Sequence, residues 1–302
     1  MTGTFILSLD CEGKWGVADH LDAGNHATLT DARLRDAYRA ILDVLDRYAV
    51  PATFAFVGVF AEPAERLRLL LPMLEEMDGD AGGYLTPALA DMREGTRQGW
   101  HGDWAVEMVQ SARSDHEIGL HGVTHVPWGD VGVRFVEAER ALLGQLTNPT
   151  RDARTFIYPR NKVGHVDQLS TMGIEGYRAA KHHSSRVASL LSEFALHEKP
   201  DQPCDRDGDQ GVIPAGRFLN FKAGLRRFVP TAVTVRRGAN MLERAARKGG
   251  IVHYWLHPEN LAAAPDTIDT LEGIVRHAAK LRDSGKCEIM TQLDYVDRQI
   301  AA

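Results

Sequence analysis

The sequence predicts an α/β protein of about seven strands, with a single (β/α) barrel as its architecture. Short apolar runs, of the length of buried strands, alternate along the chain with longer segments whose apolar residues recur at helical spacing. This alternation is typical of a parallel sheet that is covered by helices. No internal repeat and no linker divides the chain, so one barrel is favoured over the alternative, a doubly wound open sheet.

The first half of the chain supplies four of the expected strands. They span residues 5–9, 52–57, 117–121 and 154–158. Helices are expected over residues 33–48, 63–77, 104–113 and 133–146. The first helix shows its pattern clearly, since Leu34, Ala37 and Ile41 lie three and four residues apart. Residues 78–102 are rich in glycine, so we expect a long loop there with short helical pieces.

The second half continues the alternation around one interruption. Strands are expected over residues 177–180, 251–256 and 287–290. Helices are expected over residues 166–172, 240–248 and 265–281, and at the end of the chain. Residues 182–235 break the pattern, and their middle, 199–216, is polar and rich in Asp, Gly and Pro. We interpret this segment as an insertion or lid within one domain, residues 1–302.

Composition and charge narrow the class of protein. The chain has 302 residues, of which 44% are hydrophobic and 25% charged, which is ordinary for a globular protein. A chain of this length buries about three quarters of its unfolded surface, so it needs no disulfide to fold. Its three cysteines are widely spaced and form no CxxC pair, which indicates reduced thiols.

Several partners and locations are excluded or favoured on the same grounds. The net charge of −6 speaks against a nucleic-acid partner, because phosphate binding needs a basic surface. No run approaches the roughly 18 apolar residues of a membrane span, so no stable membrane insertion is expected. The N-terminus, MTGTFILSLD, has no basic region followed by a long apolar one, so we expect a cytoplasmic protein. The sequence does not predict the oligomeric state.

Polar residues gather where four expected strands end. In parallel α/β folds the chemistry lies at the carboxyl ends of the strands. One strand is followed by Asp10 and Glu12, and another by His121 and His125. A third leads through Tyr158 and Pro159 to Arg160 and Asn161, and a later strand ends at Trp255, Leu256 and His257. We therefore expect two carboxylates and three imidazoles on one rim.

The residue types at these strand ends suit a hydrolytic metal site. His121 and His125 are four apart, a spacing that lets two imidazoles converge on one ion. Glu12 could complete a set with open positions for water and substrate. Asp10 points the same way from an extended strand and could stay free as a base. His257 is a candidate general acid, because its ordinary pKa is near neutral.

Each of these features also has a purely structural explanation. The histidine pair could be two satisfied or exposed side chains, the acidic pair could cap a helix or pair in a turn, and His257 could simply pack at a strand end. We interpret His253, inside the same strand, as structural.

Four short stretches together point to a known family. They are SLDCEGKWG from Ser8, HEIGLHGVTH from His116, FIYPRNKVG from Phe156 and HYWLHPENL from His253. In this order and separation the chain resembles the polysaccharide deacetylase, or NodB-homology, superfamily of carbohydrate esterases, in an Asp-x-acid variant. The resemblance runs from Phe5 to about Met290 and is poor across residues 182–235.

The resemblance implies a distorted seven-stranded (β/α) barrel and the removal of an N-acetyl group from an amino sugar. It implies a divalent metal, usually Zn²⁺, with Co²⁺, Ni²⁺, Mn²⁺ or Fe²⁺ as options. Carried over to this sequence, Asp10 is similar to the family's catalytic base and His257 to its general acid. Glu12, His121 and His125 are similar to the metal ligands.

The sequence departs from the family pattern at two places. The usual adjacent aspartates are split here by Cys11, and the second acid is Glu12. The usual third motif, Arg-x-Pro-Tyr, has Ile157 where the arginine that orients the base should stand. We expect Arg160 to orient Asp10 instead, and its backbone N–H to help bind the oxyanion. As substrate-binding residues we expect Trp15, Tyr158, Asn161 and Trp255. Sugar rings stack on aromatic side chains, but packing in the core is the alternative for each tryptophan and is favoured by its large apolar area.

The expected substrate is a nucleotide- or lipid-linked amino sugar of surface-polysaccharide biosynthesis. Fold alone does not fix the substrate, so an amidase acting on a small non-sugar amide, such as a ureide or cyclic imide, remains an alternative. A non-catalytic binding module is a second alternative, against which the joint presence of base, acid and ligands argues.

Overall fold

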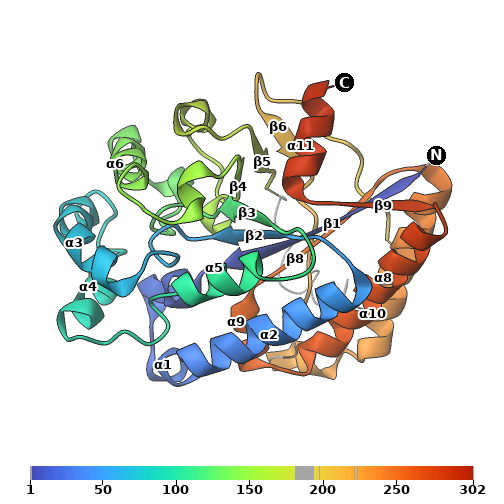
Figure 1. The fold of residues 1–302 in the computed structure, drawn as a ribbon, viewed down its shortest axis with the longest axis horizontal. Coiled ribbons are helices and arrows are strands. Elements are labelled where there is room, and N and C mark those ends of the chain that lie inside the picture. The colour runs from blue at the N-terminus through green and yellow to red at the C-terminus, as the bar shows by residue number, and fades with distance from the viewer. Residues whose placement is uncertain (1, 181–193, 197, 221, 223, 302) are drawn as a thin grey trace.

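A single curled sheet of nine strands forms the centre of the computed structural model (Figure 1). The structure describes residues 2–180, 194–196, 198–220, 222 and 224–301. Hydrogen bonds connect the strands in the order β6-β5-β4-β3-β2-β1-β8-β7, with β9 also beside β1, and all pairings between these strands are parallel. The strands are β1 (Gly3–Cys11), β2 (Thr53–Phe56), β3 (Glu117–Leu120), β4 (Thr155–Phe156), β5 (Gly176–Arg178), β6 (Gly211–Ile213), β7 (Arg217–Phe218), β8 (Ile251–Leu256) and β9 (Cys287–Met290). The result is a parallel half-barrel, which confirms the predicted α/β barrel class.

Strand β1 is the axis of the sheet and is buried along its whole length. Its apolar residues suit contact with helices and strands on both faces, as parallel sheets require. Leu9 pairs with Leu256 of β8, so the residues that follow, Asp10 and His257, reach the same level of the sheet. In the same way Phe56 pairs with Leu120 of β3, which is followed directly by His121. Register therefore brings these strand ends to one rim.

Helices cover the outside of the sheet. In Figure 1, α2, α8 and α10 run along one side, α3, α4 and α6 lie at one end, and α11 lies on the opposite side from α2. Helix α10 packs against both α8 and α2. The α-helices are α1 (Ala23–Thr28), α2 (Asp31–Tyr48), α3 (Ala64–Asp78), α4 (Thr86–Arg93), α5 (Asp103–Gln110), α6 (Val133–Leu143), α8 (Thr231–Lys248), α9 (Pro258–Ala263), α10 (Thr267–Asp283) and α11 (Gln292–Ala301). Short 3₁₀ helices are η1 (Gly13–His20), η2 (Trp128–Asp130), η3 (Pro149–Asp152), η4 (Pro159–Asn161), η5 (Val166–Gln168), η6 (Ser170–Met172) and η7 (Gly224–Phe228).

The segment expected as an insertion is in part a continuation of the barrel. Strands β6 and β7 lie inside residues 182–235 and hydrogen bond to β5 and β8. They are three and two residues long, too short to show a strand pattern in the sequence. Helix α8 begins at Thr231, nine residues before the predicted start, because its β-branched first turns are weak helix formers that packing stabilises. Part of the expected lid, residues 182–193, 197, 221 and 223, lies outside the described residues.

Among the residues that the structure describes, no helix combines the length and the hydropathy needed to cross a bilayer.

Candidate metal-binding active site

Three side chains from two strand ends converge on one point. Oε1 of Glu12 lies 2.9 Å from Nε2 of His121 and 3.0 Å from Nε2 of His125. Both imidazoles are 1% exposed, and Glu12 is 12% exposed. We expected Glu12, His121 and His125 to lie close together, and the fold brings them within hydrogen-bond distance.

The hydrogen bonds of His121 test whether this set fits a cation. Its Nδ1 lies 2.9 Å from the carbonyl oxygen of Ile157, so Nδ1 carries the proton and donates it. If the His121 ring is neutral, its Nε2 then presents a lone pair to Oε1 of Glu12. The contact therefore needs a positive charge, either a proton on Nε2 or a metal ion, between the nitrogen and the carboxylate oxygen. Two imidazole nitrogens and one carboxylate oxygen form a donor set that suits Zn²⁺ and related ions, so the residues fit a divalent metal.

The electrostatics of Glu12 agree with a cation-binding position. Burial by itself would raise the pKa of this carboxyl. The imidazoles of His125, His257 and His121 outweigh burial and hold the pKa of Glu12 well below its usual range. The carboxylate is therefore ionised and available as a ligand at neutral pH.

The turn that carries the two histidines is held by a buried carboxylate of α6. Glu139 accepts hydrogen bonds from the amide of Thr124 at 2.7 Å and from Nε1 of Trp128 at 2.7 Å. His125 itself has a φ of 64°, in the left-handed region that costs a non-glycine residue about 1 kcal/mol or more. Glu139 supplies the bonds that keep this turn in place. It lies 14 residues beyond His125, and nothing in its local sequence pattern marked it.

The base candidate Asp10 is paired with an arginine on the far side of the half-barrel. Arg178, the last residue of β5, donates from Nη1 to Oδ1 and from Nη2 to Oδ2, both at 2.7 Å. Burial would raise the pKa of Asp10, but Arg178, His121 and His257 lower it below its ordinary value. Asp10 is thus kept ionised, as a proton acceptor requires.

A short chain of hydrogen bonds lies behind Arg178. Nδ1 of His253 is 2.7 Å from the carbonyl oxygen of Pro214 and must donate to it, so Nε2 is an acceptor for the hydroxyl of Ser8 at 2.9 Å. The oxygen of Ser8 in turn accepts from Nη1 of Arg178 at 3.4 Å. Burial and the charge of Arg178 lower the pKa of His253 to about 3, so the ring is neutral.

His257 stands beside both carboxylates. Its Nε2 is 3.3 Å from Oε1 of Glu12 and 4.0 Å from Oδ2 of Asp10, and its Nδ1 contacts the side-chain amide of Asn260 at 3.1 Å. Burial lowers the pKa of His257, but the charges of Glu12 and Asp10 prevail and raise it to about 9. Such a ring carries a proton that it can give to a leaving group.

A pocket of about 380 Å³ opens onto these groups, and it contains two of the four expected substrate-binding residues. Asn161 and Trp255 line it, together with Arg160. Trp15 and Tyr158 do not: they are 0% and 1% exposed and belong to the core. For these two side chains the prediction is wrong, because the aromatic area that suits a sugar platform serves packing here.

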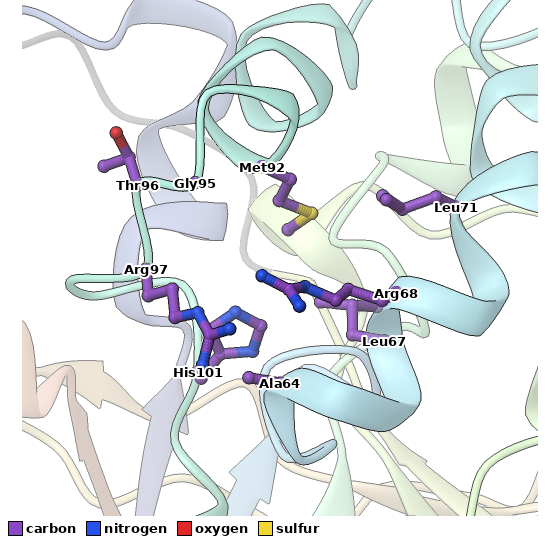
Figure 2. A pocket seen from close by; sticks show the side chains of 9 residues that line it. All are labelled: Ala64, Leu67, Arg68, Leu71, Met92, Gly95, Thr96, Arg97 and His101. Atoms are coloured by element: carbon purple, nitrogen blue, oxygen red, sulfur yellow. The ribbon is translucent and has the colours of Figure 1, made fainter.

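A separate small cavity lies between α3 and the loop before α5. Figure 2 shows Arg97 and His101 on one side of it and Arg68 and Met92 on the other. Its volume is about 10 Å³, room for a single water molecule. It is too small for a substrate, so the candidate site remains the rim around Glu12.

Part of the chain is similar to a known protein family. Residues 21–162 match the model of the polysaccharide deacetylase family. This match supports the predicted resemblance to the polysaccharide deacetylase superfamily over that part of the chain. The matched segment contains His121, His125 and Arg160, whereas Asp10, Glu12 and His257 lie outside it. The resemblance supports a hydrolase that acts on an amide or acetyl group. No curated protein matches the chain.

Solved structures share the fold of this chain. A Mycobacterium smegmatis protein assigned as a polysaccharide deacetylase is 13% identical with a TM-score of 0.61, over 99% of this chain and 91% of that one. Puue allantoinase is 13% identical with a TM-score of 0.58, over 99% and 90%. A Pseudomonas aeruginosa PAO1 protein assigned to the deacetylases is 12% identical with a TM-score of 0.52, over 97% and 89%.

The structure shows which arginine pairs with Asp10 in place of the one missing from the third motif. Arg160 does not take the expected place beside Asp10: its Nη2 donates to Oδ1 of Asp19 at 2.6 Å and to the carbonyl oxygen of Gly16 at 3.2 Å. The arginine that pairs with Asp10 is Arg178. Arg160 has a φ of 56°, so its backbone turns the side chain away from β1 and toward η1.

Proposed function

We propose that this protein is a divalent-metal-dependent hydrolase that removes an N-acyl group, expected to be acetyl, from an amino sugar. The observation that carries the proposal is the convergence of Glu12, His121 and His125 beside an ion-paired Asp10. The match of residues 21–162 to the polysaccharide deacetylase model supports the reaction type, and the donor set supports the metal. Zn²⁺ is the expected ion, with Co²⁺, Ni²⁺, Mn²⁺ and Fe²⁺ as alternatives.

The residues divide the chemistry among themselves. Glu12, His121 and His125 would hold the ion, which when bound supplies an acidified water and a polarising charge for the amide carbonyl. Asp10 accepts the proton of the attacking water, and Arg178 keeps Asp10 ionised and oriented. His257 gives its proton to the departing amine nitrogen. The backbone N–H of Arg160 is proposed as a donor to the oxyanion.

The substrate walls are proposed from the pocket. Trp255 offers one aromatic face, 4.5 Å from the guanidinium of Arg178, and Asn161 offers an amide beside it. A nucleotide- or lipid-linked amino sugar is the proposed form, and a cytoplasmic location is proposed with it.

A release assay tests the proposal directly. The protein, stripped of metal and reloaded with Zn²⁺ or Co²⁺, is incubated with N-acetyl and N-formyl amino sugars, free and nucleotide-linked, and released acetate or formate is measured. We expect release by the loaded protein and none by the stripped protein or by Asp10→Asn. Metal binding without release from any member of the panel would overturn the proposal and favour a binding module.

A small cyclic amide is the second candidate substrate. The TM-score of 0.58 to Puue allantoinase is close to the 0.61 found for a deacetylase relative, so the fold does not separate the two classes. A pocket of about 380 Å³ also suits a small ligand. Ureides and cyclic imides therefore form a second arm of the same assay, and turnover there alone would assign this alternative.

A further inference from the structure

A carboxylate outside the expected catalytic set binds the turn that carries Glu12. Glu259 lies in the first turn of α9, two residues after His257. Its Oε1 accepts the backbone N–H of Glu12 at 3.0 Å and the backbone N–H of Gly13 at 2.5 Å. The side chain is 8% exposed, so both hydrogen bonds are shielded from water. The carboxylate thereby joins the end of β1 to the start of α9.

These bonds do for η1 what a capping side chain usually does. The first amides of a helix lack partners inside it, and a side chain at the N-cap commonly accepts from them. Glu12 is the N-cap residue of η1, yet its own side chain makes no capping bond. It faces the histidines instead. Glu259 supplies the missing acceptor, so the Glu12 side chain is left free for the imidazoles.

The turn at Glu12 has little freedom of its own. Gly13 has a φ of 55°, and a Cβ there would lie 2.4 Å from the ring of Phe60. A Cβ at Gly16 would lie 1.8 Å from Oε2 of Glu12. The carboxylate of Glu12 is therefore packed against the backbone of η1, and a shift of that backbone would move it relative to His121.

Fold stability alone does not account for Glu259. Among the described residues, nothing hydrogen bonds to its second oxygen, Oε2, which is buried. A buried polar atom without a partner costs stability. The buried position of Glu259 is better explained by the hydrogen bonds that its other oxygen, Oε1, accepts from the Glu12 and Gly13 amides.

We propose that Glu259 is a positioning residue that fixes the metal ligand Glu12 and sets its distance to His257. The inference rests on the proposed function, because it takes Glu12 as a ligand. Since Glu259 is bonded to the Glu12 amide and lies two residues from His257, one carboxylate sets both sides of the 3.3 Å contact between them. A second-layer partner of this kind typically changes metal affinity by about 10–100-fold when it is removed.

Three substitutions separate geometry from charge. Glu259→Gln keeps the length and one carbonyl oxygen that can accept both amides. Glu259→Asp keeps the charge but is one carbon too short to reach both. Glu259→Ala removes the contact. The matched control is Glu117→Ala: this partly buried carboxylate accepts the backbone N–H of Leu293 at 2.9 Å, at the opposite end of the strands.

The measurement is the affinity of the metal-free protein for Co²⁺ and Zn²⁺ by chelator competition, with thermal unfolding of the same samples. We expect roughly 10–100-fold weaker binding for Glu259→Ala, a smaller loss for Glu259→Asp, and near-wild-type binding for Glu259→Gln. Glu117→Ala should lose thermal stability and keep its affinity.

Wild-type affinity in a folded Glu259→Ala or Glu259→Asp variant overturns the inference. It is also overturned if Glu259→Gln binds metal more weakly than Glu259→Asp, because charge rather than position would then be the cause. Failure of every substrate in the release assay would count against the proposed function and leave this binding comparison intact.

Discussion

Arg178 holds both carboxylate oxygens of Asp10 at 2.7 Å, although their strands are four places apart in the sheet. Neighbouring strands lie about 4.8 Å apart, so in a flat sheet β5 and β1 would be separated by roughly 19 Å. The contact exists because the sheet curls and its side chains meet inside the half-barrel. Both side chains are at most 2% exposed, so the pair lies in a low-dielectric interior.

Replacing Arg178 should move the pH dependence of the reaction. In Arg178→Met the pKa of Asp10 loses the partner that lowers it, so the acidic limb of kcat/KM should shift to higher pH. The unpaired buried charge should also destabilise the fold by about 3 kcal/mol or more. The matched control, Arg160→Met, should leave the acidic limb in place, because Arg160 pairs with Asp19. Equal shifts in both variants would show that Arg178 has no special role.

Asp10→Asn should separate metal binding from turnover. The amide cannot accept the proton of the attacking water, so we expect a loss of at least about 100-fold in kcat, with metal content close to that of the wild type. Elemental analysis and the release assay on one preparation check both halves. Substantial residual turnover would remove Asp10 from its proposed role as base.

His121→Ala should remove the metal. The ring supplies one of three converging ligand atoms and is held by the carbonyl of Ile157, so its loss leaves an incomplete set. We expect less than a tenth of the wild-type metal after dialysis, measured by elemental analysis. His20→Ala, which removes an exposed imidazole at the pocket edge, serves as the control and should keep its metal. Unchanged content in His121→Ala would contradict the ligand assignment.

Gly16→Ala should weaken metal binding without touching a ligand. The new Cβ would lie 1.8 Å from Oε2 of Glu12 and 2.8 Å from its Cδ, so the carboxylate must move away from the histidines. An affinity loss of at least about 10-fold is expected, as for other displaced ligands. Gly79→Ala is the control: a Cβ there meets nothing within 4 Å. If both variants bind Co²⁺ like the wild type, the packing of Glu12 against η1 does not set its position.

His253 should make the fold sensitive to acid. Burial and Arg178 lower the pKa of His253 to about 3, whereas in the unfolded chain it is about 6.5. Between about pH 6.5 and pH 3, His253 is therefore protonated in the unfolded state but neutral in the native state. The free energy of unfolding should fall as the pH drops toward 3, by up to about 1.4 kcal/mol per pH unit from this group.

Urea denaturation at pH 8, 6 and 5 measures this dependence. His253→Gln, which keeps polar atoms but cannot titrate, should lose less stability between pH 8 and pH 5 than the wild type. Parallel curves for the two proteins would mean that another group causes the acid sensitivity.

Local patterns were enough to predict most elements that surround the site. Strand β8 and strand β9 match their predicted ranges. Apolar residues dominate both strands, interrupted only by His253 in β8 and Glu288 in β9. The gathering of Asp10, Glu12, His121, His125 and His257 could be predicted as well. Parallel strands end on one edge of a sheet, so residues directly after them share one rim.

Only the tertiary structure showed which further residues hydrogen bond to Asp10 and Glu12 at that rim. Arg178 reaches Asp10 through the curl of the sheet, and Glu259 reaches the Glu12 amide across 247 positions of sequence. Trp15 was expected at the pocket and lies in the core. The sequence by itself determined which polar residues directly follow the strands, because the periodicity that marks a strand is local. Contacts between distant strands depend on curvature and packing, which no local pattern records.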